Sequence, residues 1–133
     1  MKIVIDSDIL IYFLKGQPEI VNKLSTYPIE NIFTTRINVT ELLYGAYNSL
    51  KIEQNLSKIS SFLESFHILE FDQKASIIFA QEKARLKQNG ILIADMDLMI
   101  SSITIANEFS LVTNNIKHFD RIKNLKIERW LTV

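Results

Sequence analysis

The chain has 133 residues, of which 47% are hydrophobic and 23% are charged, and it contains no cysteine, 3 glycines and 2 prolines. These values are ordinary for a globular domain, and they exclude a disordered chain, a collagen-like repeat, a disulfide scaffold and any site built from thiolates. Lysine and arginine number 15, as do aspartate and glutamate, so net charge alone does not direct the protein to nucleic acid.

No segment has the length of a membrane span or of a signal peptide. The longest uninterrupted apolar run is Ile9–Leu14, and the apolar stretch near the N-terminus stops at the first acid, Asp6. No linker rich in proline, glycine or serine divides the chain, and no internal repeat is visible. We therefore expect residues 1–133 to form one domain of a soluble, cytoplasmic protein that does not associate with membranes.

Short β-branched runs alternate with helical patterns along the chain. Strands are expected over residues 2–5, 32–35, 67–71, 111–113 and 126–128. Helices are expected over residues 8–15, 18–25, 38–50, 51–65, from an N-cap at Asp72 to a stop at Asn89, and over 95–109. This alternation is typical of the α/β class, in which a parallel sheet is covered by helices on both faces.

Polar side chains stand where the expected strands end. Asp6 follows the first strand, Glu41 lies in the first turn of the helix after the second strand, and Asn115 follows the fourth strand. Asp97 lies in the first turn of the helix that precedes the fourth strand. Because ligands of parallel α/β sheets bind beyond the carboxyl ends of the strands, we expect these four side chains to converge there.

Three carboxylates in one site need a partner of opposite charge or a shared proton. Two carboxylates about 5 Å apart repel by about 3 kcal/mol at an effective dielectric constant near 20. Protonation of one acid relieves the repulsion, and so does a divalent cation. Ligands that offer only oxygen select a hard ion, Mg²⁺ or Mn²⁺, rather than zinc, and such a site suits phosphoryl chemistry.

The acids also have an interpretation as helix-capping residues. Asp6 or Asp8 would cap the first helix, and Asp95 would cap the helix that carries Asp97. Asn38 and Glu41 have the spacing of a capping box, in which the glutamate reaches back to the cap amide. The capping and the metal-site hypotheses both stand at this point.

Gly45 lies inside an expected helix, where glycine costs about 1 kcal/mol relative to alanine. Such a glycine is tolerated where another backbone approaches closely. We therefore expect this helix to pack tightly on the sheet or on a second subunit, the alternative being that it ends at Gly45.

Four segments form a series in chain order: Ile3–Ile11 (IVIDSDILI), Val39–Ala46 (VTELLYGA), Asp97–Ile100 (DLMI) and Leu111–Phe119 (LVTNNIKHF). In this order, and in a chain of this size, they resemble the PIN-domain ribonucleases. The resemblance is to the VapC-type toxins of type II toxin–antitoxin pairs in particular. It extends from Met1 to Leu131, which is essentially the whole chain.

The resemblance implies a PIN-like three-layer α/β/α sandwich with a mostly parallel sheet of about five strands. It implies that Asp6, Glu41 and Asp97 hold one or two Mg²⁺ or Mn²⁺ ions and that metal-activated water hydrolyses a phosphodiester bond. The implied substrate is tRNA or another structured RNA. A cognate antitoxin that blocks the site, and a homodimer, are implied as well.

The chain departs from the family pattern at the fourth acidic position. Asn115 and His118 are the candidates there, so we expect one firmly held metal ion, with Asn115 orienting a water or a second ion. Ser7 is expected to hydrogen-bond Asp6 or a ligating water, and Asp95 is a candidate outer-shell partner.

Basic residues flank the motif segments and are expected to form a rim that contacts RNA phosphates. These residues are Lys15, Arg36, Lys117, His118, Arg121 and Lys123. Arg36, Lys117 and His118 are the candidate substrate contacts among them. The alternative is that each is an ordinary solvated surface residue.

Two other functions are compatible with the sequence. Asp6 and Asp8 resemble the Asp-x-Asp loop of haloacid-dehalogenase-like phosphatases, in which the first aspartate is the nucleophile and the second an acid or base. Leu10 stands where that loop has threonine, and Glu41 has no role in it. The other alternative is a non-catalytic PIN module that binds RNA or an antitoxin.

Overall fold

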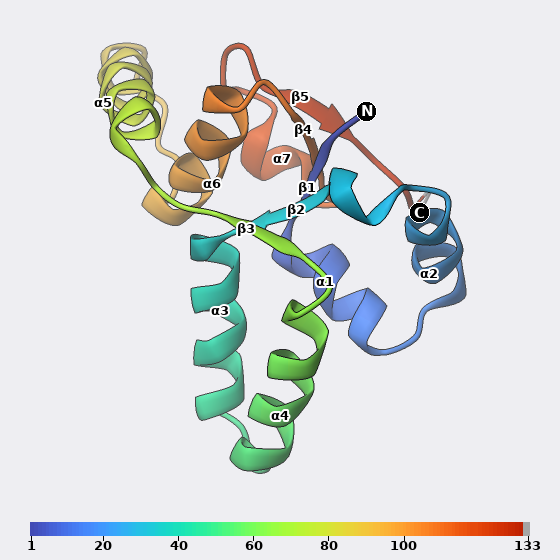
Figure 1. The fold of residues 1–133 in the computed structure, drawn as a ribbon. Coiled ribbons are helices and arrows are strands. Elements are labelled where there is room, and N and C mark those ends of the chain that lie inside the picture. Colours follow the sequence, from blue (N-terminus) through green and yellow to red (C-terminus); the bar gives the residue numbers. More distant parts are fainter. Residues whose placement is uncertain (132–133) are drawn as a thin grey trace.

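Five parallel strands form the centre of the molecule in a computed structural model that describes residues 1–131 (Figure 1). The strands are β1 (Ile3–Ile5), β2 (Ile32–Thr35), β3 (His67–Leu69), β4 (Ser110–Val112) and β5 (Lys126–Glu128). They lie in the order β3-β2-β1-β4-β5, and each neighbouring pair is parallel. The central strand β1 is buried along its whole length, as its three aliphatic side chains require.

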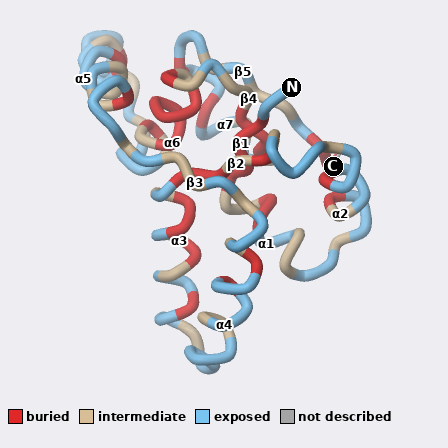
Figure 2. The backbone as a smooth tube through the Cα atoms, viewed as in Figure 1, coloured by how far each residue is buried: buried red, intermediate tan, exposed pale blue. Residues whose placement is uncertain are grey.

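Helices cover both faces of this sheet. They are α1 (Ser7–Leu14), α2 (Pro18–Ser25), α3 (Arg36–Tyr47), α4 (Ile52–Leu63), α5 (Gln73–Gln88), α6 (Asp95–Ala106) and α7 (Ile116–Phe119), with a short 3-10 helix η1 (Ile29–Asn31) before β2. Ile3 and Ile5 pack with α1 to α4, whereas Val4 between them packs with α5 to α7. This alternation along β1 produces two cores and confirms the α/β/α sandwich (Figures 1 and 2).

Most expected elements are present with small shifts at their ends. The long helix α5 is capped by Asp72, whose carboxylate accepts a hydrogen bond from the N–H of Ala75, and it ends at Asn89 as expected. The expected strands β2 and β5 have the expected bounds. Within residues 1–131, no helix is both long enough and apolar enough to cross a bilayer.

Helix α3 begins two residues before the expected start, and this overturns the capping box. Thr35 is the N-cap, and its hydroxyl oxygen accepts a hydrogen bond from the N–H of Asn38 at 3.1 Å. Asn38 therefore lies inside the helix and Glu41 in its second turn, too far along to reach the cap amide. The Glu41 side chain is free to face the end of the sheet.

The capping assignments for Asp8 and Asp95 are also wrong. Asp6 is the N-cap of α1, and its carboxylate accepts a hydrogen bond from the N–H of Ser7 at 2.8 Å. Ala94 occupies the N-cap position of α6 without a side-chain bond, and Asp95 instead accepts a hydrogen bond from Lys83 at 2.8 Å.

At Gly45 the helix neither ends nor packs closely against another backbone of this chain. Helix α3 does not break there, because it continues to Tyr47. No backbone approaches closely either, because a Cβ atom built on Gly45 would meet nothing within 4 Å. The missing side chain leaves open space beside the helix.

Candidate active site

An acidic cavity of about 410 Å³ opens at the carboxyl edge of the sheet. Its walls come from the start of α1, from α3, from the start of α6 and from the β4–α7 connection. The polar side chains that line it are Asp6, Ser7, Asp8, Glu41, Asp95, Asp97, Asn115 and His118. The structure thus brings together the four side chains that the strand-end argument selected, although they lie far apart in the sequence.

Asp6 is the most firmly held of the acids. Its Oδ1 accepts hydrogen bonds from the Ser7 N–H at 2.8 Å and from Asn38 Nδ2 at 3.0 Å. Its Oδ2 accepts one from the Thr113 hydroxyl at 2.7 Å. Burial raises the pKa of the Asp6 carboxyl, and these three bonds oppose the rise only in part. The carboxylate is therefore fixed in position and poorly solvated.

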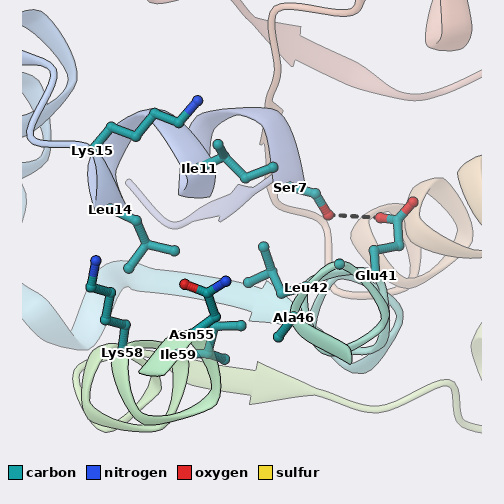
Figure 3. Close-up of a pocket in the computed structure, with 11 residues that line it drawn as sticks. Ser7, Ile11, Leu14, Lys15, Glu41, Leu42, Ala46, Asn55, Lys58 and Ile59 are labelled. Carbon is teal, nitrogen blue, oxygen red and sulfur yellow. Dashed lines mark hydrogen bonds between the residues drawn. The ribbon is translucent and has the colours of Figure 1, made fainter. Parts of the chain in front are cut away.

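Ser7 links the first helix to Glu41. The Ser7 hydroxyl donates to Glu41 Oε1 at 2.7 Å, as drawn in Figure 3, and accepts from Asn38 Nδ2 at 2.9 Å. The same Asn38 amide therefore contacts both Asp6 and Ser7, although the side chain is fully buried. Burial first, and then the negative charges of Asp6 and Asp97, raise the pKa of Glu41.

Asp97 lies at the start of α6 and faces His118 of α7. His118 Nδ1 is 3.3 Å from Asp97 Oδ2, and the His118 side chain is largely exposed. Burial, together with the charge of Asp6, raises the pKa of the Asp97 carboxyl, and His118 opposes that rise. His118 therefore stands beside Asp97, at the mouth of the cavity.

Asp8 fixes the loop that carries Asn115. Its Oδ1 accepts from the Ile9 N–H at 2.8 Å and its Oδ2 from the Asn114 N–H at 2.9 Å. The Asn115 N–H donates to the Thr113 hydroxyl at 3.1 Å, which leaves the Asn115 side chain at the cavity wall. Because both Asp8 oxygens hold backbone N–H groups, this arrangement disfavours the acid or base role that the phosphatase alternative needs.

Sequence reasoning missed two polar residues of the site. Asn38 has the spacing of a cap residue only if its helix begins at that position. Thr35, a good N-cap three residues earlier, is the signal that places Asn38 inside the helix. Thr113 directly follows β4, where its hydroxyl can reach the acids at the strand ends. The only signal for it in the sequence is its position within the Leu111–Phe119 segment.

The basic rim is only partly assembled around this cavity. His118 is its sole member among the lining residues. Arg36 lies outside and forms an exposed ion pair with Glu70 at 2.7 Å, and Lys117 is exposed on α7 without lining the cavity. Lys15 lines a neighbouring pocket instead. Asp95 does line the cavity, but its carboxylate pairs with Lys83.

The donor set suits a hard divalent cation. The carboxylates of Asp6, Glu41 and Asp97 face one cavity with raised pKa values, and the chain has no cysteine that could supply a thiolate ligand. Among residues 1–131, no three His, Asp or Glu side chains already stand close enough to enclose an ion. Glu41 is held by Ser7 and Asp97 faces His118, so these two side chains have to turn to complete such a site.

Comparisons with known proteins agree with this fold. Residues 3–125 match the PIN domain family. The chain is 38% identical to ribonuclease VapC2 of Rickettsia felis over 95% of this chain and 96% of the relative. It is 30% identical to the tRNA(fMet)-specific endonuclease VapC of Salmonella typhimurium, over 98% of both chains.

Two solved structures resemble the chain over nearly its whole length. The crystal structure of VapBC2 from Rickettsia felis, bound to a DNA fragment from the promoter, superposes with a TM-score of 0.91 at 36% identity. That match covers 98% of this chain and 100% of the other. DNA-bound VapBC from Salmonella typhimurium also gives a TM-score of 0.91, at 30% identity, covering 98% and 99% of the two chains. The family match over residues 3–125 includes every residue that lines the acidic cavity.

Proposed function

The chain belongs to the PIN-domain family, and on that premise we propose that it is a metal-dependent endoribonuclease. Its reaction is the hydrolysis of phosphodiester bonds in tRNA or another structured RNA, as the toxin of a type II toxin–antitoxin pair. The nuclease names of both relatives support this class of reaction. The haloacid-dehalogenase-like alternative loses its support, because the family match covers the Asp-x-Asp segment on which it rested.

The observation that carries the proposal is the convergence of three carboxyl groups that have no lysine or arginine within 4 Å among residues 1–131. Asp6, Glu41 and Asp97 come from three separate elements and line one cavity. Burial raises the pKa of all three, and the charge of Asp6 raises the pKa of Glu41 and Asp97 further. A site that holds negative charges together at such a cost is suited to binding a cation. Acids that served only as helix caps would have no reason to meet.

Asp6, Asp97 and Glu41 are the residues that would hold Mg²⁺ or Mn²⁺. When bound, the cation supplies Lewis acidity that lowers the pKa of a water molecule and neutralises charge on the phosphate. Asp6 contributes a carboxylate whose direction is already set by three hydrogen bonds, so little conformational entropy is lost when it takes up a ligand.

The remaining polar groups orient water and substrate. Ser7 holds Glu41 Oε1, which leaves Oε2 to accept a proton from the attacking water. The exposed Asn115 amide offers an oxygen and two N–H donors to a water or to a phosphate. His118 stands at the mouth, where Nε2 of the protonated ring can donate to a phosphate oxygen while Nδ1 faces Asp97.

The experiment that tests the proposal is an RNA cleavage assay on protein purified free of antitoxin. Total tRNA and rRNA are incubated with Mg²⁺, with Mn²⁺ or with EDTA, beside the Asp97→Asn variant. We expect discrete fragments that require the metal and disappear in the variant. Asp97 is the better choice than Asp6, because an amide at position 6 would disturb three hydrogen bonds of the fold.

Asp72→Asn is the matched control for this assay. It makes the same change of acid to amide outside the cavity, and asparagine caps a helix as well as aspartate does, so its cleavage should equal that of the wild type. Cleavage by Asp97→Asn at the wild-type rate would contradict the site assignment. Metal binding without cleavage of any RNA would instead favour the non-catalytic PIN module.

The proposal includes two protein partners. A cognate antitoxin is expected to bind the chain and block the cavity, since the similar crystal structures are those of VapBC complexes. A homodimer is expected for the isolated toxin. Light scattering on a size-exclusion column measures the molar mass, and a value near the 15.4 kDa of one chain would exclude the dimer.

A further inference from the structure

A second pocket of about 480 Å³ adjoins the acidic cavity between α1, α3 and α4 (Figure 3). Ser7 and Glu41 line both spaces, so a bound chain can pass from one to the other without leaving the surface. The walls of the second pocket are mainly aliphatic, from Ile11, Leu14, Leu42, Ala46 and Ile59. Pockets of this size and lining typically bind an organic group.

The polar groups of this pocket lie at its margins. Lys58 lies on α4, on the side opposite the Ser7–Glu41 bond, and Lys15 follows Leu14 at the end of α1 (Figure 3). Neither ammonium group has a carboxylate within 4 Å among residues 1–131. Asn55 adds an amide whose nitrogen donates to the Ser49 hydroxyl at 2.9 Å. The pocket therefore joins an apolar floor to two cations whose charges are not neutralised.

Gly45 keeps this pocket open. It lines the pocket from α3, and a Cβ atom there would meet nothing within 4 Å. In an interior helical position, glycine costs stability that alanine would restore. Packing within the chain therefore does not require a glycine at this position. A ligand that fills the space beside Gly45 would require one.

We propose that this pocket holds an unpaired nucleobase of the RNA, from a nucleotide next to the bond that is cleaved. The inference rests on the proposed function and adds a substrate-binding site to it. Enzymes that act on single-stranded nucleic acid seat an extruded base between apolar side chains and hydrogen-bond its edge. Here the aliphatic walls receive the base, Asn55 meets its edge, and Lys15 and Lys58 bind the adjacent phosphates.

Charge favours RNA over an apolar peptide as the occupant. A peptide side chain would satisfy the aliphatic walls but would leave Lys15 and Lys58 without counter-ions. A polyanion satisfies both cations, and its backbone can continue past Ser7 into the cavity that holds the reacting phosphate.

The test fills the pocket from Gly45. Gly45→Leu projects an isobutyl group into the open space, whereas Gly45→Ala adds one methyl group and takes up less of it. On an oligoribonucleotide that spans the mapped cleavage site, we expect Gly45→Leu to raise KM about tenfold, as for the loss of one bound base. Gly45→Ala should raise KM by less than Gly45→Leu, and Mn²⁺ binding by calorimetry should be unchanged in both variants.

An abasic substitution then identifies the group that the pocket holds. A single abasic ribose is placed in turn at each position flanking the cleaved bond. At one position it should impair the wild type about tenfold and have little further effect on Gly45→Leu, because both changes remove the same contact. Equal effects of the abasic ribose on wild type and Gly45→Leu at every position would overturn the proposal.

The two lysines are tested through the salt dependence of RNA binding. Lys15→Met and Lys58→Met should each lower the slope of log affinity against log salt by about 1. Lys126→Met on β5, at the opposite edge of the strands, is the control and should leave the slope unchanged. Unchanged slopes for both pocket lysines would exclude their phosphate contacts.

The outcomes separate this inference from the proposed function. Cleavage of the oligoribonucleotide by the wild type supports the proposed function, and equal cleavage by Gly45→Leu would then reject the base site alone. If Gly45→Leu cleaves RNA normally but escapes inhibition by the antitoxin, the pocket binds protein and the proposal is wrong. Absence of any RNA cleavage by the wild type would reject both.

Discussion

Asp6, Glu41 and Asp97 have different hydrogen-bonding partners, but the pKa of each carboxyl is raised. Asp6 accepts three hydrogen bonds, Glu41 accepts one from Ser7, and Asp97 faces only His118. Burial nevertheless raises the pKa of each of these three carboxyls, because desolvation outweighs the donors. In the absence of a cation, the ionised forms of these three carboxyls therefore destabilise the folded protein.

The metal-free protein should therefore lose stability as pH rises through the folded-state pKa values of these acids. A carboxyl whose pKa is higher in the folded than in the unfolded state stabilises the fold fully below its unfolded pKa, about 4, and ceases to do so above its folded pKa. In EDTA, the melting temperature of Asp97→Asn minus that of the wild type should increase from about pH 4 to pH 7. A constant difference across this range would contradict the raised pKa of Asp97.

Single interactions also decide how elements are joined. Glu82 of α5 is buried, pairs with Arg85 at 2.6 Å, and accepts the N–H of Lys123, which lies in the loop after α7, at 2.7 Å. Arg85 further donates to the Arg121 carbonyl at 3.0 Å. This small network fastens α5 to the segment that leads into β5, on the face of the sheet that carries α6.

Glu82→Gln should lower the free energy of unfolding by about 1–3 kcal/mol, because it weakens the charge-assisted bonds that the buried Glu82 carboxylate accepts from the Lys123 N–H and from Arg85. Chemical denaturation measures the change. Glu70→Gln is the matched control, since Glu70 pairs with Arg36 on the exposed surface, where such a pair is worth less than about 1 kcal/mol. Equal losses in the two variants would mean that the bond to Lys123 contributes little.

Helix α3 should gain stability from a methyl group at its interior glycine. Gly45→Ala should raise the free energy of unfolding by about 0.5–1 kcal/mol, because alanine loses less backbone entropy and nothing obstructs its Cβ. The same denaturation experiment measures the gain. A loss of stability would show that the space beside Gly45 is filled by part of the protein.

The molecule as a whole is organised around the pairing of β1 with β4 at the centre of the sheet. Because β1 lies between β2 and β4, the ends of the first and fourth strands meet, and the helices after β2 and before β4 bring their starts to the same edge (Figure 1). Asp6, Glu41 and Asp97 therefore belong to distant segments of the chain. A ligand that contacts all three ties the two halves of the sequence together.

Mn²⁺ should therefore stabilise the whole fold and not only the cavity. At a concentration about 100 times the dissociation constant, a single bound ion adds about 2.7 kcal/mol to the free energy of unfolding. The melting temperature of the wild type should rise with Mn²⁺, and that of Asp97→Asn should rise far less. An equal rise in both proteins would place the ion elsewhere.

The sequence by itself determined most of the elements and the acids that meet at the end of the sheet. Local signals such as the β-branched runs and the Asp72 cap predicted most strands and helices, because capping and periodicity depend on neighbouring residues. The strand-end rule selected Asp6, Glu41, Asp97 and Asn115 without any knowledge of their distances. The family resemblance supplied the expected reaction.

Only the tertiary structure decided which side chains hold these acids and what lies beside them. The roles of Asn38 and Thr113 depend on contacts across 32 and 107 residues, which no local pattern encodes. Arg36 is likewise removed from the expected rim by its pairing with Glu70, across 34 residues. The open space at Gly45 exists only because α1 and α4 flank α3 without filling it, and packing of that kind is a property of the assembled fold.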